Sequence, residues 1–472
     1  MPSADPLRAE RANPFGGGAP PCYPTATHQP YHGAVPKGYA RYVLAVMFGI
    51  NFLNYMDRYL GAAVSPLIQK EFHLTDTLVG LLGTAFLLVY AVCALPFGYW
   101  ADRGVRRTIV GAGVAIWSVA TVLSGLTTNF AQLFATRAAV GVGEASYYPA
   151  GTSLMADYFP KETRGRAMSY WGAGTAVGIA VGFAGGGYIG QHYGWRTAFF
   201  VTAAPGLIFA FLAFTIREPL RGAVEKRGPQ VAKAFDSSRK AFFDLMRIPT
   251  VRWTILSQTV LFFVLAANAY WLPINLNRRF NMDVSTAGLL SGVVLVAGGL
   301  VGTLLGGWVA DRRARKSQKG YLEVGIAGYL VGAVFITVAL VAPLQVGPVP
   351  VFIPAFFITV VGIYCYSGPF TAVSQNRVPP SLRASVVTML LFVSHVFGDS
   401  HSTFDVGFLS DRLGSLQLAL LLVSTPLLLI AAVLASLALR SVEDDVARAE
   451  DSWAQRGSGV QPAIEPAPVP AG

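Results

Sequence analysis

Apolar segments alternate with short polar segments along most of the chain. A helix needs about 20 residues to cross the hydrocarbon core of a bilayer. Six segments of suitable length precede a polar stretch near residues 217–252 and six follow it, which predicts an all-α polytopic membrane protein with twelve transmembrane helices in two six-helix bundles. The predicted spans lie near residues 41–68, 77–100, 107–127, 130–156, 166–190, 197–216, 252–275, 285–310, 321–342, 349–373, 383–408 and 415–439.

The predicted organisation has five parts. Residues 1–38 are rich in Pro, Gly and Ala, and we expect them to form a disordered tail. The N-terminal bundle covers residues 39–216, and the C-terminal bundle covers residues 252–440. A linker of mixed charge, residues 217–251, joins them, and residues 441–472 are expected to form a second disordered tail.

Lys and Arg residues are distributed unevenly between the two sides of the predicted bundle. The tails and the loops on their side hold 29 of them, whereas the loops on the opposite side hold 5. Cytoplasmic loops of membrane proteins carry this excess. Both termini and the linker are therefore expected in the cytoplasm, and the protein is expected in the plasma membrane, which is the inner membrane if the source is bacterial.

Composition agrees with a lipid environment. Hydrophobic residues make up 53% of the chain and charged residues only 13%, against about 25% charged residues in soluble domains. The net charge of +11 is concentrated in cytoplasmic loops, so it indicates contact with anionic lipid headgroups and no nucleic-acid partner. Cys22, Cys93 and Cys365 lack the spacing of a metal or redox site, and no cofactor is expected.

The two sets of six spans resemble each other. The sequence GYWADR at residues 98–103 closes the second span, and GWVADR at residues 307–312 closes the eighth, 209 positions later. Matching loops in two six-helix halves indicate a parallel repeat with the substrate site between the halves. We interpret these loops as a cytoplasmic latch whose contacts form in one state and break in the other, although charges that only set topology are an alternative. The predicted latch residues are Gly98, Asp102, Arg103, Arg107, Gly307, Asp311 and Arg312.

The repeated G-x-x-x-D-R pattern with a following basic cluster resembles the major facilitator superfamily over about residues 40–440. Three further segments are similar to its Spinster-like branch, which includes transporters of sphingolipids and lysophospholipids. They are NYMDR at residues 54–58, the segment from Arg137 to Tyr147, and HVFGD at residues 395–399. The sequence SHSTFD at residues 400–405 departs from that branch, which usually has a Ser-Pro pair there.

Four ionisable residues lie inside the predicted first and fourth spans. Asp57 and Arg58 are adjacent and project about 100° apart, while Arg137 and Glu144 share one helix face about 10 Å apart. Charges at bilayer depth need partners or water and are usually functional. We expect Asp57 to bond to neighbouring helices, and Arg58 to line a cavity and pair with Glu144 as a proton-coupling switch; a static pair needed for folding is the alternative.

Three further ionisable residues, Asp76, His395 and Asp399, belong to the predicted coupling and substrate sites. Asp76, at the outer start of the second span, is expected to complete an outer gate with Arg58. His395 and Asp399 are four residues apart and share a face, as do His401 and Asp405 on a different face. A proton-linked or substrate role and a purely structural role both fit these pairs better than a metal site.

Glycines recur at four-residue spacing in the fifth span, at residues 174–190, and in the eighth span, at residues 288–306. Small residues at this spacing let helix backbones approach closely. The resemblance implies that these two helices pack across the halves, so we expect the glycine seams to form a sliding contact between them.

The substrate surface is predicted from aromatic and polar residues at the middle depth of several spans. Such side chains suit an amphiphile with a polar head, although each of them also fits a packed core. The predicted substrate residues are Asn54, Tyr55, Ser146, Tyr147, Asn268, Tyr270, Trp271, Tyr364, Tyr366 and His395.

The sequence lacks a phosphate-binding loop and the common hydrolase motifs, so we expect neither an ATPase nor an enzyme. The resemblance implies a monomeric secondary transporter that works by alternating access, driven by a proton gradient, and moves a lysophospholipid or sphingoid-type lipid. A proton-coupled permease or exporter of organic anions or amphiphilic drugs is an alternative. A passive lipid scramblase or a membrane receptor is an alternative of another class.

Overall fold

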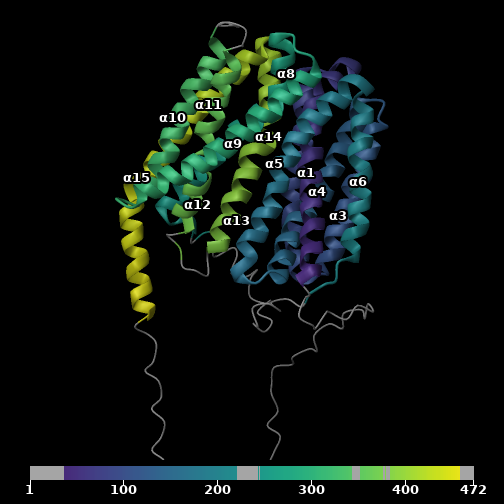
Figure 1. Cartoon of the computed structure of the whole chain (residues 1–472). Helices are drawn as coiled ribbons and strands as arrows, with labels where there is room; N and C mark the ends of the chain where they lie inside the picture. The colour runs from purple at the N-terminus through teal and green to yellow at the C-terminus, as the bar shows by residue number, and fades with distance from the viewer. Residues whose placement is uncertain are drawn as a thin grey trace, which may run out of the picture.

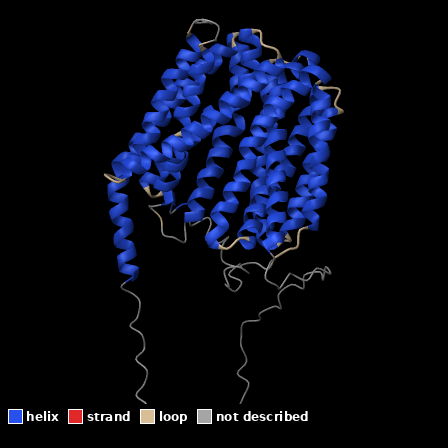
Figure 2. Ribbon diagram, viewed as in Figure 1, coloured by secondary structure: helices blue, strands red, loops and turns tan. Residues whose placement is uncertain are grey.

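The structure is a computed structural model that describes residues 37–219, 243, 245–342, 351–375, 378 and 383–457. Helices joined by short turns make up nearly all of this part of the chain (Figure 2). The expected N-terminal tail up to residue 36, most of the linker (residues 220–242 and 244) and the expected C-terminal tail from residue 458 lie outside the described residues.

The first half consists of six helices whose bounds lie close to the predicted spans. Thr75 and Asn129 cap the starts of α2 and α4 with side-chain hydrogen bonds, and Gly194, at φ 87°, both ends α5 and precedes α6. The helices are α1 (Lys37–Phe72), α2 (Asp76–Arg103), α3 (Arg106–Gly125), α4 (Phe130–Tyr158), α5 (Lys161–Tyr193) and α6 (Trp195–Thr215).

The second half repeats this plan with two interrupted spans. Asp283 caps α9 by accepting a hydrogen bond from the Thr286 amide at 2.9 Å, and this bond holds the pKa of Asp283 below its usual range. The elements are α8 (Pro249–Phe280), α9 (Val284–Ala314), α10 (Gly320–Val341), α11 (Phe352–Tyr364), α12 (Ser367–Gln375), α13 (Arg383–Ser394), the π-helical η2 (His395–Asp399), α14 (Ser400–Leu413) and α15 (Leu416–Gly457).

Within the described residues, nine helical stretches are long and apolar enough to cross a membrane on composition alone, with α11 and α12 counted as one stretch. The segments outside this set are α1, α4 and the α13–η2–α14 segment. The first two carry Asp57, Arg58, Arg137 and Glu144, and the third is broken by the π-helix. With α11–α12 and α13–α14 each counted as one span, the helices give the predicted twelve.

The last helix is longer than expected, because α15 continues to Gly457. The expectation of disorder from residue 441 is therefore wrong for residues 441–457. The start of this extension is anchored by packing and polar contacts: Val442 is fully buried, and Asp445 accepts a hydrogen bond from the Thr250 amide at 2.9 Å.

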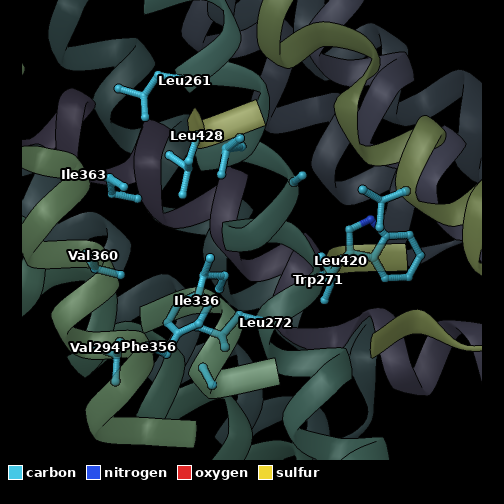
Figure 3. Close-up of a cluster of buried hydrophobic side chains, with 14 of the residues drawn as sticks. Leu261, Trp271, Leu272, Val294, Ile336, Phe356, Val360, Ile363, Leu420 and Leu428 are labelled. Atoms are coloured by element: carbon cyan, nitrogen blue, oxygen red, sulfur yellow. The ribbon is translucent and has the colours of Figure 1, made fainter. Parts of the chain in front are cut away.

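The two halves lie side by side, with the start of α1 and the end of α15 at the same end of the molecule (Figure 1). We call this end cytoplasmic, following the distribution of Lys and Arg, and the other end outer. The second half has a large apolar core, in which Trp271, Ile336 and Leu428 are buried (Figure 3).

The predicted packing of α5 on α9 across the halves is confirmed, with Gly288 and Gly292 of α9 in the contact, but the glycine series of α5 packs elsewhere. A Cβ added at Gly178 or Gly182 would lie 2.5 Å from a backbone oxygen of α1, so the repeated glycines of α5 face their own half. The contact between the halves uses Gly187, one position off that series, and Gly288 of α9. Four-residue spacing defines a helix face but does not say which helix covers it.

Candidate functional site

Two oppositely charged pairs join α1 to α4 inside the first half. Arg58 donates to Glu144 at 3.0 Å, which is the pairing expected from the sequence. Arg137 lies 3.5 Å from Asp57, which also accepts from the Thr121 hydroxyl of α3 at 3.1 Å. The adjacent positions of Asp57 and Arg58 on α1 thus reach two residues of α4 that are two helical turns apart.

Arg58 is enclosed by aromatic rings as well as by its carboxylate partner. Its guanidinium carbon lies 5.2 Å from the ring centre of Tyr55, 4.9 Å from Phe86 and 4.8 Å from Tyr90. The Glu144 side chain is fully buried, and the Arg58 side chain is 16% exposed. Aromatic faces stabilise a desolvated cation, so this site can hold Arg58 charged even when its carboxylate partner is neutralised.

A cavity of about 110 Å³ lies between the two halves next to these pairs. Arg58 and Arg137 contribute to its wall from the first half. Tyr270 of α8, Asp399 of η2 and Thr403 of α14 contribute from the second half. Both halves therefore line one space that contains two cations and one acidic side chain.

Several buried polar atoms at this site have no hydrogen-bond partner in the described part of the chain. They include Glu144 Oε1, Arg58 Nε, Asp57 Oδ1 and Asp399 Oδ1; Asn54 Nδ2, about one turn of α1 before Arg58, is also buried without a partner. Buried polar atoms are nearly always bonded to protein, water or ligand. The site is therefore suited to bind water or the polar group of a substrate.

His395 and Asp399 form a pair in η2, with His395 Nδ1 2.6 Å from Asp399 Oδ2. The His395 ring lies edge-on between Tyr90 of the first half, at 6.2 Å, and Phe262 of the second, at 5.3 Å. No group of three potential metal ligands occurs among the described residues.

The predicted substrate residues separate into two groups. Tyr270 lines the cavity and donates to the Val79 carbonyl of α2 at 2.7 Å, while Tyr55 contacts Arg58 beside it. The residues in the second group do not line this cavity. Ser146 bonds to the Gly143 carbonyl, Tyr147 to Trp171, Asn268 to Ser424 and Trp271 to Thr403, and Tyr366 packs on Tyr329, whereas Tyr364 packs against the glycines of α9.

The predicted outer gate between Asp76 and Arg58 is wrong. Asp76 instead binds Arg278 of α8, at 2.5 and 2.8 Å, and accepts from Ser410 of α14 at 2.6 Å. Arg58 lies 14 residues, about 21 Å, before the end of α1, so it is too deep to reach the outer end. Asp411 adds to this closure by accepting from the backbone amides of Asp76 and Thr77.

The predicted cytoplasmic latch makes no contact between the halves in the described residues. Arg107 donates to the Phe214 and Ile216 carbonyls of its own half, and Arg103 lies over the ring of Tyr99. On the second half, Tyr321 donates to Asp311 at 3.5 Å and Arg312 lies over Trp308. Of the remaining predicted latch residues, Asp102 is exposed, and nothing in the described part of the chain lies within 4 Å of a Cβ added at Gly98 or Gly307.

Arg106, an arginine whose position in a cytoplasmic loop predicts only a topogenic charge, is the central residue of the cytoplasmic end of the first half. It is fully buried, pairs with Asp157, and donates to Glu218 at 2.7 Å and to the Ser153 carbonyl at 3.1 Å. Its position at the first residue of α3 gave no sign of burial, since exposed arginines are typical of such loops.

Comparisons with known proteins agree with this architecture. The family model of the Major Facilitator Superfamily matches residues 47–398. Protein spinster homolog 1 of Xenopus laevis is 30% identical over 394 residues, which cover 79% of this chain and 73% of that protein. The human protein of the same name is 30% identical over 398 residues, covering 80% and 74%. An MFS-type efflux pump of Mycolicibacterium smegmatis is 29% identical over 390 residues, covering 82% and 87%.

Solved structures of transporters share the fold of this chain. A bacterial homologue of the human lysosomal transporter Spinster, in an inward-facing and unoccupied conformation, superimposes with a TM-score of 0.76 at 25% identity, covering 87% of this chain and 99% of that one. A D-xylose–proton symporter shares the fold, with a TM-score of 0.68 at 15% identity, covering 83% and 97%. The chain belongs to the Major Facilitator Superfamily, in its Spinster-like branch, and is a multi-pass membrane transporter rather than an enzyme.

Proposed function

We propose that this protein moves a lysophospholipid or a sphingoid-type amphiphile across the membrane and couples that movement to a proton gradient. The observation that carries the proposal is the Arg58–Glu144 pair, in which Arg58 lines the cavity between the halves and Glu144 is buried behind it. Proton transfer to Glu144 neutralises one member of the pair and frees Arg58 for an anionic group of the substrate. The gradient then serves as the energy source in place of a nucleotide or another cofactor.

The cavity chemistry supports an amphiphilic substrate. Arg58 and Arg137 suit a phosphate or carboxylate, Asp399 suits an amine, and the rings of Phe86 and Tyr270 suit an apolar chain. Several relatives carry the name of spinster proteins, which agrees with the Spinster-like resemblance that implies this lipid class. Each chain contains both halves of the site, so a monomer suffices.

Alternating access is supported by the closed outer end. Asp76 and Arg278 join the halves there, whereas among the described residues the predicted latch residues form no hydrogen bond or ion pair between the halves at the cytoplasmic end. In this proposal the structure corresponds to the state that receives or releases substrate on the cytoplasmic side. Breaking the Asp76–Arg278 pair and closing the cytoplasmic end would complete the cycle.

Export of amphiphilic drugs is a second candidate, because the chain covers 87% of an MFS-type efflux pump. Purified protein in proteoliposomes would be tested with a labelled lysophospholipid and with ethidium as a soluble cationic drug. Saturable movement of the lysophospholipid, with competition by unlabelled lipid and no movement of ethidium, is expected. Ethidium movement without lipid movement would overturn the lipid assignment and favour the second candidate.

A further inference from the structure

The eleventh span of the bundle is interrupted by one turn of π-helix. The turn, η2, joins α13 to α14, and the amide of Ser400 bonds to the carbonyl of His395, five residues earlier instead of four. Such turns are rare, hold one residue more than an α-helical turn, and occur frequently at functional sites. The segment that follows it, SHSTFD at residues 400–405, is the one that departs from the Spinster-like branch.

The turn lies where the second half meets the central cavity. Asp399 lines the cavity, and its Oδ1 atom has no hydrogen-bond partner among the described residues. The ring of His395, at the start of the turn, lies edge-on to the ring of Tyr90 of the first half, at 6.2 Å. A molecule that occupies the cavity can therefore contact the turn directly.

The helix that follows the turn carries contacts that close the outer end. Thr403 of α14 donates to the Gly80 carbonyl of α2 at 2.8 Å. Ser410 donates to the Asp76 carboxylate at 2.6 Å, and Asp411 accepts from the Asp76 amide at 3.0 Å. Each of these contacts requires that α14 presents this face to α2, so all of them depend on the rotation of α14 about its axis.

Replacing the π-helical turn with an α-helical turn would change that rotation. The surplus residue of the turn would pass into the regular helix. Because each residue of an α-helix adds about 100° and about 1.5 Å, α14 would turn and shift by these amounts relative to α13. A rotation of this size takes Thr403 and Ser410 away from α2, so it would break the outer contacts together.

Side chains that follow the turn are hydrogen-bonding partners of its backbone carbonyls. They are the Ser400 hydroxyl, which donates to Val396 at 2.7 Å, the Ser402 hydroxyl, which donates to Asp399 at 2.8 Å, and His401 Nε2, which lies 3.1 Å from the Phe397 carbonyl. In lipid, a carbonyl that loses its amide donor is costly unless a side chain replaces that donor. The π form is therefore satisfied by side chains, and an α-helical turn would satisfy the same carbonyls with amides.

We propose that η2 is a two-state turn that links the central cavity to the outer closure. The turn is π-helical when the outer end is closed, as in this structure, and α-helical when the outer end is open. A molecule in the cavity beside Asp399 biases the turn, and the turn determines whether α14 can bind α2. The proposal rests on alternating access, but it requires neither the lipid substrate nor proton coupling.

Spin-label distances across the turn test this proposal. Labels at Thr388 of α13 and Phe408 of α14, both exposed, lie on the two sides of η2. Asp76→Asn is expected to raise the outward-open population about tenfold, and a second Thr388–Phe408 distance should rise by the same factor. The distance between the outer ends of α2 and α14, measured in the same variant, shows separately whether the outer end opens. Opening with a single, unchanged Thr388–Phe408 distance would overturn the proposal, because α13 and α14 would then move as one rigid helix.

A deletion distinguishes a two-state turn from a fixed one. Phe397 is 64% exposed, and deleting it should convert η2 to an α-helical turn while α13 and α14 keep their present faces. Asp76→Asn is then expected to leave the outer end closed, because no surplus residue is left to change the register of α14. Equal opening by Asp76→Asn in the deletion protein and in the parent would overturn the proposal.

Ser400→Ala is expected to act in the opposite direction. It removes the hydroxyl that bonds to the Val396 carbonyl in the π form, so the outward-open population should rise about fivefold, as the loss of one hydrogen bond implies. A fall in that population would contradict the two-state turn. This substitution and the distance across the turn both test the proposal without requiring the deletion protein to fold.

Discussion

Arg58 of α1 and Glu144 of α4 meet at 3.0 Å beside a cavity that both halves of the protein line. The Glu144 side chain is fully buried, and its second carboxylate oxygen has no partner in the described residues. Three aromatic rings surround Arg58. In the proposed mechanism, this contact joins the group that takes up the proton to the cation that binds the substrate, which is what coupling between them requires.

The outer closure is expected to control which side of the protein is open. Asp76→Asn or Arg278→Gln removes the ionic contact between α2 and α8. Since hydrogen bonds to charged groups contribute about 1.5–3 kcal/mol, the outward-open population should rise about tenfold or more. Spin-label distances between the outer ends of α2 and α14 would measure it.

The matched control for the outer closure is Arg196→Gln. Arg196 pairs with Glu71 at 2.7 Å near the same end of the molecule, but both residues belong to the first half. This substitution should leave the distance distribution unchanged. An equal shift in the control, or none in the Asp76 and Arg278 variants, would show that the contact does not hold the outer end closed.

Much of the fold follows from the sequence because lipid restricts the possibilities strongly. The twelve apolar segments predict the observed helices. The uneven distribution of Lys and Arg predicts which end of the bundle is cytoplasmic. The Arg58–Glu144 pair was predictable for a similar reason, since few charges lie at bilayer depth and each needs a partner. Asp57, at a similar depth, likewise pairs with Arg137.

Other site features depend on information that helical spacing does not contain. The partner of Asp76 is Arg278, which is 202 positions away and lies at an outer end where many loops meet. Tyr147 and Trp271 have the polar and aromatic character of cavity residues, yet both are buried in cores. Residue type alone does not distinguish a side chain that faces a cavity from one that faces a neighbouring helix.

Arg106→Ala is expected to destabilise the first half. The substitution leaves Asp157 and Glu218, which are 13% and 18% exposed, without their buried cation. Removing one partner from a buried ion pair costs about 3–5 kcal/mol. Thermal unfolding in nanodiscs would measure the loss. Arg103→Ala, at the exposed last residue of α2, should change stability by no more than about 0.5 kcal/mol, and an equal loss in both variants would contradict the assignment.

Gly288→Ala is expected to weaken the contact between α5 and α9. The added Cβ would lie 2.5 Å from the Phe183 carbonyl oxygen, so one helix must shift. Overpacking of this kind costs about 1–3 kcal/mol, and disulfide formation between cysteines placed on the two helices should slow. Gly172→Ala is the control, because nothing lies within 4 Å of its added Cβ. Unchanged cross-linking in the Gly288 variant would show that the seam tolerates a wider spacing.

The central claim is that Glu144 couples substrate movement to protons. Labelled lysophospholipid movement would be measured in proteoliposomes with and without a pH gradient, for the parent protein, Glu144→Gln and Glu71→Gln. Glu71→Gln is the control, because Glu71 also pairs with an arginine but its side chain is 43% exposed. We predict gradient-driven movement in the parent and in Glu71→Gln, and its loss in Glu144→Gln. Lipid movement that depends neither on the gradient nor on the Glu144 substitution would contradict the account and indicate a passive scramblase.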